Sequence, residues 1–237
     1  MALPRINDDK PIYELTLPTS GKKIKYRPFL VREQKNILIA SESESSKESI
    51  LSMIQCIEAC APEVNIKELS TAEVDFVFLH IRSKSVGEKA KVNFSCTECE
   101  TSFPISVDLT KILIEGYNKN NVIELNDTIK LKLKYTTYQD SINNIEQIQE
   151  EESVTSLIFK TLKLCLHSLE VNEELIMFSD ESDEEIDGFL NSLNPEQLEK
   201  CLDYVKNLPK LNYETNFICE KCNHNNEVKI QSFEDFF

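Results

Sequence analysis

Four cysteines are the residues of this chain whose type and spacing could do chemistry. They form two Cys-x-x-Cys pairs, Cys96 with Cys99 and Cys219 with Cys222. Thiolate sulfurs are soft ligands that bind zinc at about 2.3 Å, and the short spacing lets both sulfurs of a pair point the same way. Two pairs complete a tetrahedral set. The spacing therefore predicts one zinc ion on all four sulfurs, with no position left for water and thus a structural role.

The sequence around the two pairs is repeated. Residues 93–99 read NFSCTEC and residues 216–222 read NFICEKC, and apolar residues follow each pair at matching offsets. Each copy has the pattern of a strand, a tight turn and a returning strand. We therefore predict a split zinc ribbon, in which two knuckles separated by a long insertion share one metal ion and fix the end of the chain to its middle.

Other roles for these cysteines are weighed against zinc. A disulfide within each turn is disfavoured because nothing in the sequence indicates an oxidising compartment. A thioredoxin-like redox site needs its Cys-x-x-Cys to open a helix that lowers the thiol pKa, whereas both pairs here lie in hairpin patterns. His224 is a possible substitute ligand, but beside four cysteines we expect it next to the site or in solvent.

The composition is that of a folded protein. The chain has 237 residues, of which 41% are hydrophobic, enough for one large domain or two small ones. No apolar stretch reaches the length of a membrane span, and the first residues lack the apolar core of a signal peptide. We expect a protein of a reducing cytosol. The remaining cysteines, at helical apolar positions, are expected in the core: Cys56, Cys60, Cys165 and Cys201.

The net charge of −15 is unevenly distributed. Residues 170–199 include eleven acidic residues and no lysine or arginine, whereas residues 21–35 carry six basic residues and one glutamate. Such a balance disfavours nucleic-acid binding, which requires clustered cations. The acidic stretch is either a solvated face or a docking surface for a basic partner, and Arg27 and Arg32 are candidate partner contacts on the basic one.

Alternation and helical spacing predict an α+β fold, with a helical body and short antiparallel hairpins. Hairpins are predicted at residues 12–27 and 122–135. Helices are predicted by apolar periodicity and capping residues at 29–42, 48–60, 71–84, 154–169, 183–192 and 195–207. Ser70 and Glu73 are expected to form a capping box at the start of the third helix.

The domain prediction follows the two knuckles. Residues 1–110 hold the first hairpin, three helices and the first knuckle, and residues 111–208 form a hairpin plus helical insertion. Residues 209–237 hold the second knuckle and pack on the first segment as one domain. The chain ends in a phenylalanine-rich tail, in which Phe233, Phe236 and Phe237 either pack on the protein's own sheet or anchor a partner.

The sequence lacks the patterns of common enzymes. Four glycines in the whole chain and no glycine-rich loop disfavour nucleotide binding, and three well-separated histidines suggest no nucleophile–base arrangement. We therefore do not expect an enzyme.

Several short stretches resemble the T4-type bacteriophage baseplate protein family, the hub subunits and hub-assembly factors of contractile tails. The similar stretches are YELTLPTSG at 13–21, YRPFLVRE at 26–33, IRSKSVGE at 81–88 and the terminal DFF at 235–237. The resemblance implies a non-enzymatic role in virion assembly in the host cytoplasm, as a chaperone or a subunit of the central baseplate hub. The partners that it implies are other hub proteins; the charge balance above argues against nucleic acid as a partner.

Two other functions stay open at this point. A zinc-ribbon nucleic-acid-binding or transcription regulator would need a basic or aromatic knuckle surface, whereas Glu98, Glu100 and Glu220 make it acidic. A Cys-x-x-Cys thiol redox enzyme would differ from both in its metal content.

Overall fold

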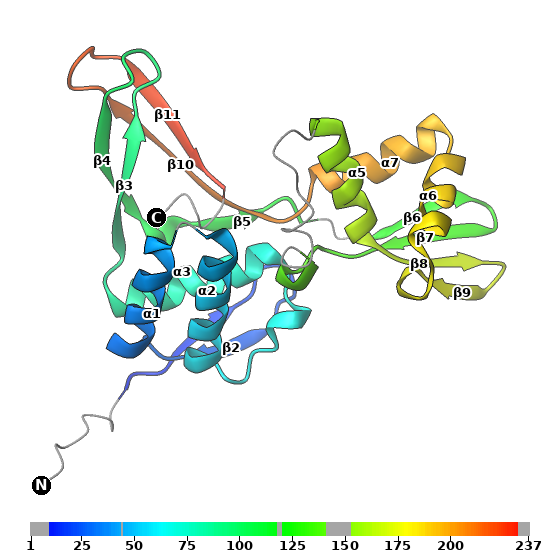
Figure 1. Cartoon of the computed structure of the whole chain (residues 1–237), viewed down its shortest axis with the longest axis horizontal. Coiled ribbons are helices and arrows are strands. Elements are labelled where there is room, and N and C mark those ends of the chain that lie inside the picture. Colours follow the sequence, from blue (N-terminus) through cyan, green and yellow to red (C-terminus); the bar gives the residue numbers. More distant parts are fainter. Residues whose placement is uncertain (1–9, 44, 118–119, 141–152, 232–237) are drawn as a thin grey trace, which may run out of the picture. The chain divides into compact units, whose positions relative to one another are not determined.

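The structure, a computed structural model, describes residues 10–43, 45–117, 120–140 and 153–231. It mixes helices with short antiparallel sheets, so this part of the fold prediction is confirmed (Figure 1). The chain forms two compact units: unit 1 comprises Met1–Glu115 and Lys210–Phe237, and unit 2 comprises Gly116–Pro209. The predicted tail contacts Phe233, Phe236 and Phe237 lie outside the described residues. Within the described residues, no helix is both long and apolar enough to cross a membrane.

Unit 1 begins with the predicted hairpin, in which β1 (Tyr13–Thr16) pairs antiparallel with β2 (Lys23–Tyr26). Gly21 in the connecting turn has a φ of 68°, a left-handed conformation that glycine adopts without strain. Ile24 is buried whereas its neighbour Lys23 is exposed. The alternation in the sequence thus reflects one buried and one wet face.

Three helices follow: α1 (Val31–Glu42), α2 (Ser46–Cys60) and α3 (Thr71–Ser85). Their bounds match the predicted ones within two residues. Helix α2 packs against both of its neighbours and buries Cys56 and Cys60, as predicted. Helix α3 is the central one, since most of its residues are buried.

The start of α3 differs from the predicted capping box. The Ser70 hydroxyl accepts the N–H of Glu73 at 3.3 Å, as expected. The Glu73 carboxylate instead accepts the backbone N–H and the hydroxyl of Ser20, at 3.1 and 2.9 Å. The buried carboxylate therefore ties the turn between β1 and β2 to α3 rather than completing a local cap.

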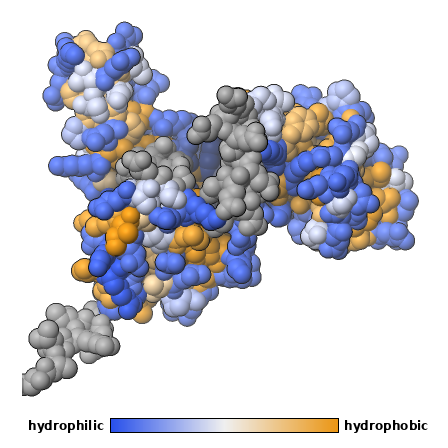
Figure 2. Space-filling view, in the orientation of Figure 1, coloured by the Kyte–Doolittle hydropathy of each residue, from blue (hydrophilic) through white to orange (hydrophobic). Residues whose placement is uncertain are grey.

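Helix α1 is less buried than its apolar spacing predicts. Only Glu33 and Ala40 are buried, while Val31, Leu38 and Ile39 are 79%, 55% and 55% exposed. In Figure 2, apolar residues reach the surface of unit 1 in the region that α1 occupies in Figure 1. The apolar residues of this helix therefore do not all face the core.

The two cysteine motifs lie on two hairpins of unit 1. The first consists of β3 (Lys89–Ser95) and β4 (Ser102–Asp108), and the second of β10 (Lys210–Ile218) and β11 (Asn225–Ile230). A three-residue strand that the sequence analysis missed, β5 (Leu113–Glu115), pairs with the start of β10. Figure 1 shows the hairpins side by side, with their turns at the same end.

The base of both hairpins packs on α3 in one apolar core. Side chains from α3, from the two hairpins and from β5 are buried together there: Phe76, Leu79, Ala90, Val107, Leu109, Ile112, Ile114, Leu211 and Ile230. Val107 and Ile230, which stand at the same place in the two repeats, are both completely buried. The repeated sequence thus gives each hairpin the same attachment to the core.

The last residue of unit 1 before unit 2 and the first residue after it are neighbours, because Glu115 of β5 pairs with Lys210 of β10. Gly116 follows at once, with a φ of 77°, and a Cβ atom on it would lie 2.7 Å from the carbonyl oxygen of Leu208. Both the conformation and the close approach require glycine here.

The described part of unit 2 contains a four-stranded antiparallel sheet and several helices. Its strands are β6 (Val122–Asn126), β7 (Ile129–Leu133), β8 (Leu166–Val171) and β9 (Glu174–Met177), hydrogen-bonded in that order. The α-helices described over their full length are α5 (Val154–Cys165), α6 (Asp183–Ser192) and α7 (Pro195–Lys206). The apolar core contains Leu131, Leu133, Leu162, Cys165, Leu166, Leu190, Cys201 and Tyr204. Cys165 and Cys201 are core residues, as predicted.

One predicted helix in unit 2 ends too late. The apolar pattern over residues 154–169 predicted a single helix, but the helix ends at Cys165 and β8 begins at Leu166. Leu169 pairs with Leu131 of β7, so the last four residues of the predicted helix belong to the sheet.

Candidate metal centre

The two Cys-x-x-Cys turns have the same backbone geometry. In the first, the Cys96 N–H donates to the carbonyl of Thr101 at 3.0 Å, and the Glu100 N–H donates to the carbonyl of Cys96 at 2.9 Å. In the second turn, the Cys219 N–H donates to the carbonyl of His224 at 2.8 Å, and the Asn223 N–H donates to the carbonyl of Cys219 at 2.9 Å. The repeat in the sequence is therefore a repeat in structure.

Each turn closes on a residue in the left-handed region. Glu100 has a φ of 55°, and Asn223, at the same place in the second repeat, has a φ of 58°. Asparagine tolerates this conformation, whereas glutamate adopts it at a cost. The tight turn is what aims both sulfurs of each pair to one side.

The four sulfurs meet in one cluster. Every Sγ atom lies within 4.8 Å of the other three. Cys96 Sγ is 3.6 Å from Cys222 Sγ, and Cys99 Sγ is 3.5 Å from Cys219 Sγ, so the short approaches join one hairpin to the other. In a regular tetrahedron with metal–sulfur bonds of about 2.3 Å, sulfurs are about 3.8 Å apart. The cluster is close enough to this geometry that the four sulfurs could hold a single tetrahedral ion.

The cluster is buried on one side and open on the other. Cys96 and Cys219, the first cysteine of each pair, are buried, whereas Cys99 is partly exposed and Cys222 is exposed. Among the described residues, the group that could hold a metal consists of the four cysteines alone. His224 contributes its backbone carbonyl to the second turn, as noted above, and its side chain is not part of the group.

Asn226 connects the two turns, and the sequence analysis did not identify it. Its carbonyl oxygen accepts the N–H and the hydroxyl of Thr97, at 2.9 and 3.0 Å. Its amide nitrogen donates to the carbonyl of His224 at 3.1 Å and lies 3.5 Å from Cys96 Sγ. Because Asn226 is only 2% exposed, these bonds are protected from water. It holds the first knuckle against the second.

Hydrogen bonds around the cluster favour thiolates at two positions. Burial raises the pKa of Cys96, but N–H groups of Cys99 and Glu98 and the Asn226 amide outweigh it and lower the pKa to about 6. The Thr101 hydroxyl, 3.3 Å from Cys99 Sγ, is the main cause of a lowered pKa of Cys99. Thr101, like Asn226, was not identified from the sequence.

The neighbouring sulfurs act in the opposite direction on Cys222. An N–H of His224 lowers the pKa of its thiol, but loss of hydration and the three nearby sulfurs raise it to about 12. Four thiols at this spacing cannot all ionise without a cation, because like charges repel. A divalent metal ion would stabilise all four thiolates, and the arrangement is suited to hold one.

Comparison with known proteins gives a family for the chain. Residues 10–237 match the family of the T4 bacteriophage base plate protein. The chain belongs to this family. Over 226 residues it is 22% identical to the baseplate hub assembly protein gp26 of Enterobacteria phage T4, covering 95% of this chain and 97% of that protein. No solved structure matches the chain. The resemblance predicted from short motifs is confirmed.

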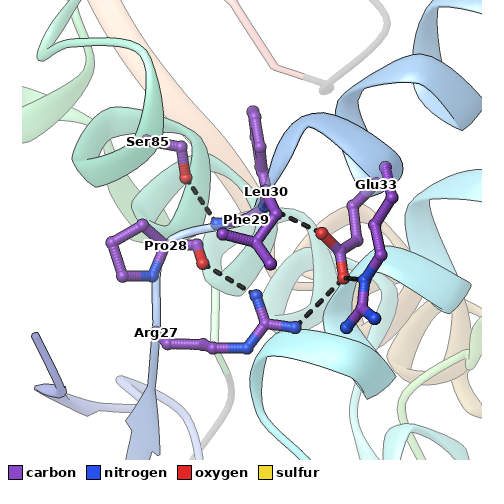
Figure 3. A network of polar contacts seen from close by, with 7 residues as sticks. Arg27, Pro28, Phe29, Leu30, Glu33 and Ser85 are labelled. Atoms are coloured by element: carbon purple, nitrogen blue, oxygen red, sulfur yellow. Dashed lines mark hydrogen bonds and ion pairs between the residues drawn. The ribbon is translucent and has the colours of Figure 1, made fainter. Parts of the chain in front are cut away.

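In this baseplate protein, the predicted partner contacts Arg27 and Arg32 both donate to the carboxylate of Glu33, and Figure 3 shows Arg27 beside Glu33. Arg27 Nη2 and Arg32 Nε donate to Glu33 Oε1 at 3.0 and 2.7 Å, and the backbone N–H of Leu30 donates to Glu33 Oε2 at 2.8 Å. Burial raises the pKa of Glu33, but these three donors together lower it to about 2.

The two arginines have different surroundings. The Arg27 side chain is 17% exposed and also donates to the carbonyl of Pro28 at 2.9 Å, so its guanidinium is used within the fold. The Arg32 side chain is 71% exposed. Of the two candidates, Arg32 is the one with most of its side chain exposed to solvent.

Proposed function

We propose that this chain acts in assembly of the baseplate hub of a contractile-tailed phage, without catalysing a reaction. The observation that carries the proposal is similarity over nearly the whole chain to a hub assembly protein of phage T4. Because the similarity includes both units, neither one has been replaced by an unrelated domain. The site of action would be the host cytoplasm, where tails are built, and the partners would be other hub proteins.

We further propose that the four-cysteine cluster holds one structural zinc ion in a split zinc ribbon. All four ligands would be thiolates, the set that suits zinc best among common divalent ions. With four protein ligands, no coordination position remains for a substrate or for water, which argues against metal catalysis. The ion would join two hairpins that are more than one hundred residues apart in sequence and so stabilise unit 1.

A thiol redox function has less support than a structural metal. Both Cys-x-x-Cys motifs lie in hairpin turns, and no helix begins at either pair, so the dipole that activates thioredoxin-like cysteines is absent from these described turns. A transcription or nucleic-acid role has less support because the knuckles carry Glu98, Glu100 and Glu220, and the net charge is −15.

The proposed function is tested by deleting the gene from its phage and supplying the protein from a plasmid. We expect the deletion to abolish infectious particles, with tails that lack a complete baseplate in electron micrographs, and the plasmid to restore them. Mass spectrometry of purified virions then separates two forms of the role: a hub subunit is present in the particles, and an assembly chaperone is absent. Normal baseplates in the deletion phage would contradict the proposal.

A further inference from the structure

The two outer strands of the unit 2 sheet, β6 and β9, are protected to different degrees (Figure 1). In β6 the register shifts between Glu124 and Asn126. The Leu125 carbonyl between them accepts a hydrogen bond from the Gln197 side chain of α7 at 2.8 Å, and α7 packs against the strand. A bulge and a covering helix both keep an edge strand from pairing with another chain. Among the described residues, β9 has neither.

The backbone of β9 is open on its outer side. The strand pairs with β8 without a register shift, and no described strand pairs with its other side. The turn before it consists of Asn172 and Glu173, whose φ values of 51° and 71° are those of a two-residue turn that closes on a hydrogen-bonded pair containing Glu174. Such pairs alternate with non-hydrogen-bonded ones, so the N–H and C=O of Leu175 and the N–H of Met177 point away from β8. These groups can bond to an added strand.

The edge also carries exposed apolar side chains on both of its faces. Leu175 is 65% exposed and Ile176 is 39% exposed. Successive side chains of a strand point to opposite faces. Leu175 pairs with Glu170, whereas Ile176 pairs with Leu169, which packs against the core of unit 2. A strand added beside β9 would cover apolar surface on both faces of the sheet.

The surroundings of this edge are acidic. Glu173, Glu174 and Glu181 are exposed, and among the described residues none of them forms an ion pair. Residues 170–199 contain eleven acidic residues and no lysine or arginine. A hydrogen bond with Glu185 and the charge of that carboxylate raise the pKa of Glu181. The negative charge at this edge is therefore not neutralised by neighbouring cations of its own segment.

This charge selects the kind of strand that the edge can accept. A second copy of this chain would bring the same carboxylates together, and like charges on adjacent strands destabilise their pairing. A strand that carries lysine or arginine would neutralise them. The lysines within this sheet, Lys130 and Lys132, lie on β7, two strands from β9, and Lys130 pairs with Glu170 at 3.3 Å. They leave the edge itself acidic.

We propose that β9 is a docking edge, on which an extended, basic segment of a partner protein adds as the next strand of the sheet. Its backbone bonds to the outward groups of Leu175 and Met177, and its apolar side chains cover Leu175 and Ile176. Its basic residues lie against Glu173 and Glu174. That the partner is another hub protein rests on the proposed function, whereas the docking edge does not.

The test uses the full-length protein and a fluorescent synthetic peptide, KTVIVTK, with both ends blocked. We expect saturable binding by fluorescence anisotropy, and binding of the charge-reversed peptide ETVIVTE that is weaker by about fivefold or more. Glu174→Lys should weaken binding of the basic peptide by a similar factor. Glu199→Lys makes the same change at an exposed position of α7, the helix that packs on the opposite edge strand, and should leave the affinity unchanged.

Hydrogen exchange of single amides identifies pairing with the edge itself. The basic peptide should slow exchange of the Leu175 and Met177 amides, which point outward, and leave those of Glu174 and Ile176, which point toward β8, as they are. Leu175→Pro removes an N–H that β8 does not use, a position where edge strands tolerate proline. It should keep the melting temperature within a few degrees of the natural value and abolish peptide binding.

Four results would each overturn the proposal. The first is no saturable binding, and the second is equal affinity for the two peptides. The third is an equal loss of affinity in Glu174→Lys and Glu199→Lys. The fourth is a dimer of the natural protein, seen by native mass spectrometry, that Leu175→Pro converts to a monomer, because a second copy would then occupy the edge. These results do not bear on hub assembly, which the gene deletion tests separately.

Discussion

The two units of this baseplate protein use cysteine in opposite ways. In unit 2, Cys165 and Cys201 are completely buried among apolar side chains, and burial raises the pKa of both thiols, to about 12 and about 11. In unit 1, the four clustered cysteines lie at the far end of two hairpins, where hydrogen bonds lower the pKa of Cys96 and Cys99. The first kind of cysteine fills space in the core, and the second kind is placed where it could bind a cation.

This difference has a consequence for how each unit is held together. Unit 2 is one continuous segment whose sheet and helices enclose a single apolar core. Unit 1 is built from two segments separated by 94 residues, Gly116–Pro209, and its hairpins share an apolar core only at their base. Toward the other end, the hairpins meet through the rings of Phe103 and Phe217, 6.4 Å apart, through the Asn226 bonds and through the cysteine cluster. Metal should therefore matter for unit 1 and not for the core of unit 2.

The largest effect is expected from Cys219→Ser. Structural zinc contributes on the order of 10 kcal/mol of binding free energy that becomes folding free energy. Loss of one of four ligands should release the metal, and amides of β10 and β11 should exchange hydrogen much faster. Amides of β7 and α5 in unit 2 should keep their protection.

The matched control is Cys201→Ser, which alters a core cysteine of unit 2 and leaves the cluster intact. It should lower protection in unit 2 alone, with the metal retained. If Cys219→Ser lowered the amide protection of both units equally, the hypothesis that the metal stabilises unit 1 alone would be wrong.

A core substitution in unit 2 should show the reverse pattern. Leu162 is completely buried, and Leu162→Ala should destabilise unit 2 by about 2–5 kcal/mol, through lost burial and a cavity. Denaturant unfolding followed by hydrogen exchange measures it. Leu175→Ala makes the same change at a side chain that is 65% exposed, and should cost less than about 0.5 kcal/mol. Metal content should be the same in both variants.

A smaller effect is expected at Glu33 of unit 1, and it depends on pH. Its pKa is lowered from 4.5 to about 2, so the carboxylate stabilises the fold above pH 4.5 and this contribution falls as the pH approaches 2. The loss should be about 1.5 kcal/mol between pH 4.5 and 3. In Glu33→Gln this part of the acid dependence should be missing.

The control for Glu33 is Glu14→Gln, at a 68% exposed carboxylate that lies 3.9 Å from Lys25. Such surface pairs contribute little, so its acid profile should match that of the natural protein. If Glu33→Gln and the natural protein lost stability with falling pH in the same way, protonation of Glu33 would not be the cause of that loss.

The smallest effect concerns His80 of α3, whose ring lies 4.4 Å from that of Phe76. Burial, helped by Lys84, lowers its pKa from 6.5 to about 4. The folded state thus keeps the ring neutral where the unfolded chain binds a proton, and stability falls as the pH drops below 6.5. The decrease should be about 1 kcal/mol between pH 6.5 and 5.5. His80→Gln should remove it; an unchanged slope would place the titration elsewhere.

Local patterns in the sequence predicted most of the helices and strands, because alternation and capping residues depend only on neighbouring residues. Alternation in residues 23–26 gave a strand with Ile24 buried, and capping residues such as Asn194 with Pro195 gave the start of α7. The end of α5 could not be obtained this way. Leu162, Cys165, Leu166 and Leu169 have helical spacing, and only pairing of Leu169 with Leu131 shows where the strand begins.

The cysteine cluster was predictable because its ligands are few and their spacing repeats. Its supporting residues were harder to find. In the repeat, Asn226 stands where the first copy has Phe103, and this break was the one signal that could have identified it. Its function depends on Thr97, more than one hundred residues away.

The most direct test of the account is the zinc content of the purified protein, measured by inductively coupled plasma mass spectrometry together with its intact native mass. We predict one zinc ion per chain in the natural protein and in Cys201→Ser, and less than one tenth of an ion in Cys96→Ser and Cys219→Ser, which alter one hairpin each. Full zinc in either of those two variants, or none in the natural protein, would contradict a single ion shared by the two hairpins.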